Sequence, residues 1–312
     1  MTALSRRRLL VIAAGTAAIA AAVAAAAAAL ADAGLRRWKG VALGGAAEMI
    51  LPAEALPLLP RLQAEIARLE AVFSLYRPDS ALSRLNAAGR LEAPPLELVD
   101  LMGRARAVSA LTGGAFDVTV QPLWSLHARH ARAGTRPAAA ELGAARALVD
   151  WQAVSVAPDA VRFARPGMAV TLNGIAQGYI TDRVADLLRR EGLTEVLVSL
   201  GETRALGAHP SGRPWQVAPA EGAAPLPLSG GALATTAAAG TRIDPRGHLL
   251  DPRTGLPGGE GLRVTVAATT ATTADALSTA LPLLPAAERA RVLAAGGATA
   301  AWIDDGHGVV RL

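Results

Sequence analysis

Apolar side chains along the chain follow two spacings, and each spacing predicts a different element. They recur every three or four positions in five stretches, which predicts amphipathic helices over residues 60–71, 96–112, 180–190, 274–284 and 286–295. Short apolar runs between turn residues predict strands over residues 151–156, 161–164, 169–172, 195–200, 232–236, 249–250 and 263–268, with a closing hairpin over 299–303 and 308–312. Helices among many short strands, without regular βαβ alternation, indicate an α+β fold.

Proline, glycine and small polar residues mark the connections between these elements. Residues 78–80 (Pro-Asp-Ser) predict a turn that caps a helix, and two glycines at 113–114 predict a helix end. Residues 127–150 are rich in alanine around a proline and predict a helical insert or a linker. Residues 219–231 are rich in proline and glycine and predict a loop.

The first 33 residues differ from the rest of the chain. Ser5 and the arginines at 6–8 precede an uncharged, alanine-rich run over residues 9–31. A basic start followed by an apolar stretch is typical of an export signal, and the S-R-R-x-L-L pattern is similar to a twin-arginine signal. The apolar run is also long enough for a membrane anchor, and a buried core helix is a third interpretation. We therefore expect a signal or inner-membrane anchor over residues 1–33, a periplasmic location, and one domain over residues 34–312.

Charge and cysteine content narrow the choice of partners. The chain has 31 basic and 26 acidic residues, and three arginines are the only charged residues in its first 31 positions. The remainder is therefore close to neutral. It shows no basic stripe interleaved with aromatic residues, so nucleic acid is not an expected partner. Because the chain has no cysteine, disulfides and thiolate metal sites are excluded.

The sharpest chemical signal in the sequence is the segment TADALSTA. Asp275, Ser278 and Thr279 are spaced i, i+3 and i+4 on a predicted helix and therefore share one face. A carboxylate and two hydroxyls offer only oxygen ligands, which suit a hard cation such as Mg²⁺. The alternative is that Asp275 stabilises the positive end of its helix and the hydroxyls are merely solvated.

A second candidate lies in the segment TLNGIAQG, residues 171–178. The pattern predicts a strand that ends, and a helix that begins, around Gly174 and Gly178. Glycines let a ligand approach the backbone, the first N–H groups of a helix bind anions, and a free carbonyl could complete a metal shell. The spacing fits neither of the common nucleotide-binding fingerprints. The glycines could equally serve close packing of the helix on the strand.

Two further segments place polar side chains near turns. Phe116 and Asp117 follow two glycines and could present a ring and a carboxylate to a ligand. His248, Asp251 and Arg253 lie within six residues of each other, and Arg253 could hold a phosphate. A helix cap and a structural turn are the corresponding alternatives.

Taken in order, these segments resemble the ApbE family, the FAD:protein FMN transferases. The resemblance spans about residues 41–284 and rests on seven motifs: FSLYRPDSALSRLN (73–86), GAFDVTVQPLW (114–124), TLNGIAQGYITDRVADLL (171–188), VLVSLGETRALG (196–207), ALAT (232–235), HLLDPRTGLP (248–257) and TADALSTAL (273–281). It implies an α+β fold of two lobes with FAD in the cleft between them. It also implies transfer of FMN from FAD to a threonine hydroxyl of a partner flavoprotein, with release of AMP and with Mg²⁺ to neutralise the pyrophosphate.

The resemblance also implies a role for individual residues. The implied catalytic residues are Asp275 and His248, with His248 as the proton acceptor. Mg²⁺ would be bound by Asp275, Ser278, Thr279 and the backbone carbonyl of Gly174. Contacts with FAD are implied for Leu43, Tyr76, Ala115, Phe116, Asp117, Thr171, Gln177, Asp182 and Leu249.

The chain departs from the family pattern at two positions that are expected to contact FAD. Where D-L-G-G-I-A-K-G is usual, Thr171 and Gln177 replace a carboxylate and a lysine. This variant is similar to an accessory branch linked to nitrous oxide respiration, whose target is a membrane flavoprotein. Losing the lysine charge weakens attraction for phosphate. A non-catalytic flavin carrier and an FAD pyrophosphatase are therefore the alternatives, with a solute-binding protein a distant fourth.

Overall fold

The computed structural model describes residues 34–42, 44–219, 223–238 and 247–312. The expected signal or anchor segment and Leu43 lie outside these ranges. Inside them, no helix is both long enough and apolar enough to cross a membrane.

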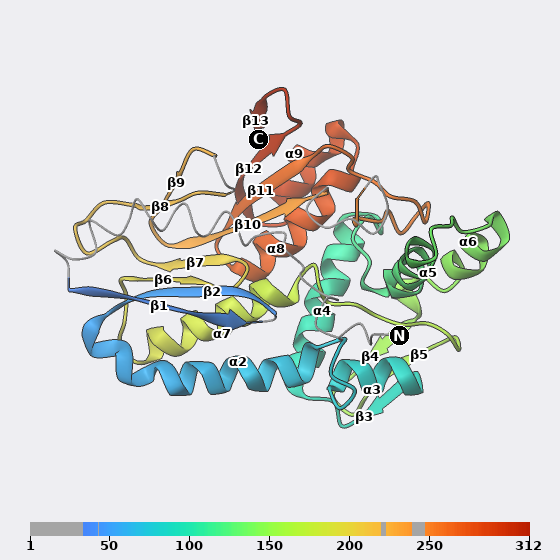
Figure 1. Cartoon of the computed structure of the whole chain (residues 1–312), viewed down its shortest axis with the longest axis horizontal. Coiled ribbons are helices and arrows are strands. Elements are labelled where there is room, and N and C mark those ends of the chain that lie inside the picture. The colour runs from blue at the N-terminus through green and yellow to red at the C-terminus, as the bar shows by residue number, and fades with distance from the viewer. Residues whose placement is uncertain (1–33, 43, 220–222, 239–246) are drawn as a thin grey trace, which may run out of the picture.

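An eight-stranded sheet is the largest element of the fold (Figure 1). Its strands follow the order β1 (Leu35–Ala42), β2 (Gly45–Pro52), β6 (Val196–Ser199), β7 (Thr203–Leu206), β10 (Gly231–Ala237), β11 (Arg263–Ala268), β12 (Ala298–Asp304) and β13 (Val309–Arg311). Every neighbouring pair in this sheet runs antiparallel. The expected α+β class, including the closing hairpin of β12 and β13, is confirmed.

The two faces of the sheet are covered by different elements. Helix α7 (Ala176–Arg190) lies against β6 and β7, and helix α8 (Ala271–Ala280) lies against β10 and β11. A small hairpin of β8 (Trp215–Val217) and β9 (Leu226–Leu228) shares a separate core with the opposite face. Side chains alternate across a strand, so the neighbours Met49 and Ile50 enter these two different cores.

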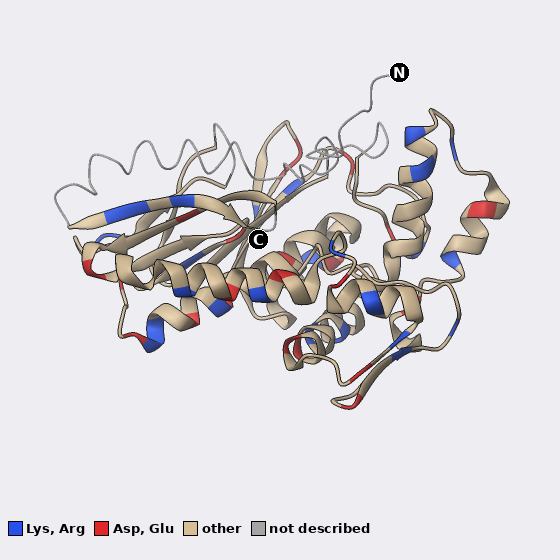
Figure 2. Ribbon diagram, turned by 60° about the horizontal axis from the view of Figure 1, so that its bottom comes forward, with Lys and Arg blue, Asp and Glu red and all other residues tan. Residues whose placement is uncertain are grey.

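Further helices and a small sheet extend the fold beyond the large sheet (Figure 1). The helices are α2 (Leu59–Phe73), α3 (Ala81–Ala88), α4 (Leu96–Leu111), α5 (Gln121–Arg132), α6 (Ala139–Arg146) and α9 (Ala286–Ala295), and the small sheet holds β3 (Arg90–Glu92), β5 (Ala160–Phe163) and β4 (Val154–Val156). Residues of both charge signs are interspersed along α2, as Figure 2 shows. There Arg68 pairs with Glu65 one turn away and with Glu97 on α4. The turn predicted at residues 78–80 caps α3, because the Ser80 side chain accepts the backbone N–H of Ser83.

The structure corrects several of the predicted strands. Residues 169–172 form no strand. The N–H of Val170 bonds to the Asn86 side chain, and that of Thr171 bonds to the carbonyl of Val118 in a 3-10 helix. Residues 151–153 form a 3-10 turn, and Leu250 makes only an isolated bridge to Pro257. The loop predicted at residues 219–231 contains β9. The hairpin of β1 and β2 is a strand pair that the apolar pattern did not predict.

Close contact between α7 and α8 holds the centre of the molecule together. Helix α7 begins at Ala176, so Gly178 lies inside the helix and not at a strand end as predicted. A Cβ atom on Gly178 would lie 2.2 Å from the carbonyl oxygen of Ala271 and 2.5 Å from its carbonyl carbon. The absence of a side chain at this position is therefore what lets the two helices approach.

We expect Gly178→Ala to lower the free energy of unfolding by about 2–3 kcal/mol, because the added methyl group must push α7 away from the backbone of α8. Gly103→Ala, in the interior of α4, is the matched control. A Cβ at Gly103 meets nothing within 4 Å, so this change should stabilise the protein by about 0.5–1 kcal/mol. Urea denaturation of both variants measures the difference, and equal effects would contradict the packing role of Gly178.

Candidate functional site

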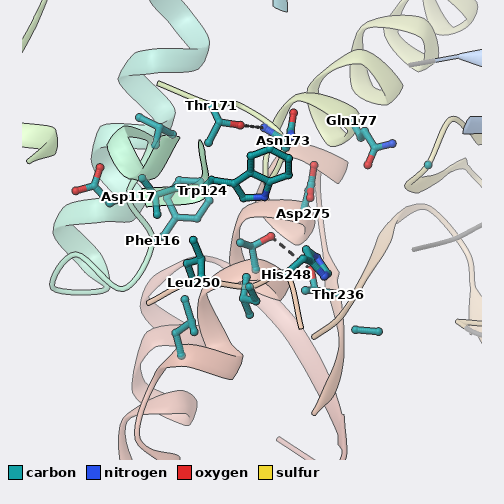
Figure 3. A pocket seen from close by; sticks show the side chains of 18 of the residues that line it. Phe116, Asp117, Trp124, Thr171, Asn173, Gln177, Thr236, His248, Leu250 and Asp275 are labelled. Atoms are coloured by element: carbon teal, nitrogen blue, oxygen red, sulfur yellow. Dashed lines mark hydrogen bonds between the residues drawn. The ribbon is translucent and has the colours of Figure 1, made fainter. Parts of the chain in front are cut away.

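A large open pocket lies where α8, the start of α7 and several loops meet (Figure 3). Its empty volume is about 1350 Å³, a figure that includes the space open to solvent. The pocket brings together ten residues that the sequence predicts for the site: Ala115, Phe116, Asp117, Thr171, Gly174, Gln177, His248, Leu249, Asp275 and Thr279.

Asp275 is the central acidic group of this pocket. It is only 3% exposed, and its Oδ2 accepts the backbone N–H of Gly178 at 2.9 Å. Burial raises the pKa of Asp275 to about 7, the Gly178 hydrogen bond opposes this rise, and the charge of Asp182 adds to it. A buried carboxylate in this state gains strongly from a nearby cation, because a cation stabilises the ionised form.

Glu202 is a second buried carboxylate in the same pocket. It is 8% exposed, and its carboxylate accepts the backbone N–H of Thr235 at 3.2 Å. Burial, followed by the negative charge of Asp275, raises the pKa of Glu202 well above its usual range. Among the residues described, neither Glu202 nor Asp275 forms an ion pair with a basic side chain. Burial thus favours the neutral form of both acids, and a cation in the pocket would stabilise their ionised form.

Three hydroxyl groups and the backbone of Gly174 lie close to the part of α8 that carries Asp275. Thr236 on β10 contacts the hydroxyls of Ser278 at 2.8 Å and of Thr279 at 3.4 Å. A Cβ atom on Gly174 would lie 3.0 Å from the Thr279 side chain, so the backbone of Gly174 passes directly beside that residue. Ser278 is fully buried, does not line the pocket, and donates its hydroxyl to the carbonyl of Asp275.

These oxygens decide what kind of metal the pocket could hold. Within the described ranges, no three His, Asp or Glu side chains come together as a metal cluster. A cation would therefore need Asp275 together with hydroxyl and carbonyl oxygens, a donor set that suits Mg²⁺ and not a transition metal. The juxtaposition of Asp275, Thr279 and Gly174 fits that requirement.

Phe116 and Asp117 form the opposite wall of the pocket. Asp117 accepts the N–H and hydroxyl of Thr119, at 2.7 and 2.6 Å, and the N–H of Trp151, at 3.2 Å. Burial raises the pKa of Asp117, while these hydrogen bonds lower it. The carboxylate therefore fixes the shape of this wall as well as facing the pocket.

The N-terminal end of α7 carries or adjoins three further predicted residues, Thr171, Gln177 and Tyr76. Thr171 accepts the N–H of Asn173 at 3.3 Å, and the Gln177 side chain packs over Gly201, where a Cβ would meet it at 2.6 Å. Tyr76 does not line the main pocket. It is 49% exposed and lines two smaller hollows, both of which share Asn173 with the main pocket.

Asp182 is predicted as a contact with FAD, but the structure gives it a structural role outside the pocket. Its carboxylate accepts the N–H groups of Ala271 and Thr272, each at 2.8 Å, and the hydroxyl of Thr272 at 2.6 Å. Arg204 pairs with it at 3.0 Å, and both side chains are largely buried. Asp182 thus caps the N-terminus of α8, where the helix dipole favours a negative charge.

The pocket-lining residues that sequence reasoning did not select include Trp124, Asn173, Glu202 and Thr236. The first three of these lie inside the motifs, and Asn173 is next to Gly174, which was selected. The acid at Glu202 follows a glycine with a φ of +97°, a turn that an S-L-G-E pattern could have suggested. Thr236 gave no signal, because a threonine in a strand is ordinary.

The fold and the pocket agree with comparisons to known proteins. The sequence model of the ApbE family matches residues 40–303. An FAD:protein FMN transferase from Klebsiella pneumoniae (strain 342) is 32% identical over 256 residues, which cover 74% of this chain and 72% of that protein. Another, from Salmonella typhimurium, is 31% identical over 254 residues with the same coverage.

Solved structures show the same likeness. A mutant of the flavin transferase ApbE from Vibrio cholerae has a TM-score of 0.78 at 26% identity, covering 89% of this chain and 96% of its own. The apo form of the Pseudomonas stutzeri flavinyl transferase ApbE has a TM-score of 0.76 at 30% identity, covering 89% and 94%. The fold and pocket thus define an α+β protein with a large open pocket beside α7 and α8. The chain belongs to the ApbE family.

We expect Asp182→Ala to lower the free energy of unfolding by about 3 kcal/mol, because it removes three hydrogen bonds and leaves Arg204 as an unpaired, largely buried charge. Asp186→Ala is the matched control on the same helix. Asp186 pairs only with Arg189 at the surface, so its loss should cost less than about 1 kcal/mol. Denaturation in urea measures both, and a loss of ligand binding without a loss of stability would restore Asp182 as a binding residue.

Proposed function

We propose that this protein transfers FMN from FAD to a threonine hydroxyl of a partner flavoprotein, in a reaction that depends on Mg²⁺ and releases AMP. The observation that carries the proposal is the buried Asp275 beside Thr279 and Gly174, in an open pocket that Phe116 and Gln177 also line. Relatives named FAD:protein FMN transferases, at up to 32% identity, support the choice of substrate and of acceptor class.

Mg²⁺ bound at Asp275, Thr279 and the Gly174 carbonyl would neutralise the pyrophosphate of FAD and the charge that develops on the leaving AMP. The chain's own residues supply the remaining requirements. Asp275 keeps its orientation through the N–H of Gly178. Thr236 holds the hydroxyl of Thr279 towards the pocket. Phe116 and Leu249 provide apolar walls that exclude water from the reacting phosphorus.

The chemical step joins the acceptor to the FMN half of the substrate. The threonine oxygen of the acceptor forms a bond to the FMN phosphorus, the bond from that phosphorus to the AMP oxygen breaks, and AMP leaves with the electron pair. The threonine proton goes to His248, which lies in the pocket wall near Thr236 (Figure 3). Because the nucleophile comes from the partner, no nucleophilic triad is needed in this chain.

The location and the partner rest on the sequence. The proposed export signal or anchor over residues 1–33 would place the pocket in the periplasm, where a membrane flavoprotein of nitrous oxide respiration is a suitable acceptor. The S-R-R-x-L-L pattern and the T-L-N-G-I-A-Q-G variant support these two proposals.

We expect Asp275→Asn to reduce FMN transfer by about 100-fold or more, because loss of the Asp275 carboxylate charge removes stabilisation of the transition state. Asparagine keeps an oxygen for the Gly178 N–H, so the thermal midpoint without Mg²⁺ should not fall. Transfer is measured as flavin fluorescence of the acceptor on a denaturing gel and as its mass. Asp305→Asn, at an exposed turn, is the control. Transfer by the Asp275 variant at the unchanged rate would refute the metal assignment.

We expect His248→Ala to lower the turnover number by about 10²–10⁴-fold while FAD affinity changes little, because the acceptor proton loses its recipient. His307→Ala, in the exposed turn before β13, should have no effect. Single-turnover kinetics and a pH–rate profile separate the proton step from binding. A rise in the KM for FAD with an unchanged turnover number would instead make His248 a binding residue.

The carrier alternative is tested in the same assay. Thr171 and Gln177 remove two charges that the family pattern usually places near FAD, which is the feature that favours a protein that only holds flavin. The Vibrio cholerae transferase on the same acceptor is the positive control. A labelled acceptor and stoichiometric AMP establish the transferase. FAD bound without AMP release, on an acceptor that the control enzyme labels, would establish the carrier.

A further inference from the structure

Trp124 lies on the boundary between two hollows of the surface. It belongs to the first turns of α5 and lines the main pocket together with Phe116 and Asp275. It also lines the neighbouring hollow that contains Tyr76. In Figure 3 its indole ring stands inside the pocket, between Phe116 and Asn173.

The backbone that carries Trp124 is firmly held. Leu123 is fully buried, and it lies against Gly255, where a Cβ would meet the Leu123 side chain at 3.1 Å. One turn further on, the buried His127 contacts the carbonyl oxygen of Gly255 at 2.8 Å through its Nε2. These contacts fix α5 from its inner side. The backbone position from which the Trp124 side chain extends is therefore set by α5.

Trp124 also differs from other tryptophans in the contacts of its ring. Trp151 and Trp302 each lie under an arginine guanidinium at 5.6 Å, and Trp215 packs edge-on with His209. In the described part of the chain, the ring of Trp124 has no such partner, and its indole N–H donates to no residue. A half-buried aromatic ring that lines a pocket and has no such partner is suited to stack on a planar ligand.

We propose that Trp124 is a binding residue that stacks on a planar ring of FAD and so sets the affinity for the dinucleotide. This inference rests on the proposed function only in taking FAD as the ligand. Asp275 and Thr279 mark where the pyrophosphate lies, and Trp124 borders the path from there towards the hollow of Tyr76. Isoalloxazine and adenine share the chemistry that an indole face recognises, and the two halves of FAD can be tested separately.

Two substitutions separate stacking from simple covering of an apolar wall. Trp124→Phe keeps an aromatic face, whereas Trp124→Leu keeps apolar volume without one. We expect the Phe variant to bind FAD within about threefold of the unchanged protein, and the Leu variant to bind at least about tenfold more weakly. Binding is measured with the full chain and Mg²⁺, without acceptor, by the quenching of flavin fluorescence. Equal affinities of the Leu and Phe variants would overturn the proposal.

Tryptophan emission gives a readout that does not depend on the Leu variant folding. FAD should quench the emission of the unchanged protein, and most of that quenching should disappear in Trp124→Phe but persist in the control Trp302→Phe. Unchanged quenching in Trp124→Phe would contradict the stacking. Titration with FMN and with ADP shows which ring is held. A Trp124→Leu variant that binds both as tightly as the unchanged protein would also overturn the proposal.

The outcomes remain separate from those of the proposed function. Failure of the unchanged protein to label an acceptor would refute the transferase, yet the comparison of FAD affinities would still decide the role of Trp124.

Discussion

The hydrogen bond from the Gly178 N–H to Asp275 joins two helices that are 97 residues apart in sequence, and the site depends on it. It can form only because Gly178 has no side chain to keep α7 away from Ala271. The same approach brings Gly174 beside Thr279, so one steric constraint places a carboxylate, a hydroxyl and a backbone carbonyl together. Packing and chemistry are thus determined at one contact, and a single methyl group there would disturb both.

Two acids near this contact have opposite roles. Asp182 receives hydrogen bonds from the first turn of α8 and pairs with Arg204, so its charge is satisfied within the protein. Asp275 and Glu202 are equally buried but have no basic partner among the described residues. Burial of unpaired carboxylates costs stability unless something compensates it. The unpaired carboxylates of Asp275 and Glu202 therefore cost stability at the pocket, whereas the paired carboxylate of Asp182 does not. This is the physical difference between an acid that stabilises the fold and one that is available to a ligand.

Much of this arrangement could be predicted from the sequence, and the exceptions have physical causes. Helix spacing predicted that Asp275, Ser278 and Thr279 share one face. It did not predict that Ser278 is buried below the pocket surface, because burial of a helix face depends on the neighbouring strand β10. The motif around Asp182 did not reveal that this residue caps α8, because a cap on another segment can be recognised only when the position of the capped helix is known. The hairpin of β1 and β2 was missed because its outer strand mixes arginine, tryptophan and glycine without a strict alternation. The sequence did not predict that Trp124 lines the pocket, because a single sequence does not show which face of α5 borders a cavity.

The segments that line the pocket run from Gly45 near the start of the described chain to Leu283 near its end. No fragment of the protein contains the site, and no early stage of folding can present it, because its parts meet only after the long-range pairings of the sheet have formed. A nascent chain therefore offers FAD nothing to bind. A dinucleotide that binds there will stabilise the folded state and not its separate segments.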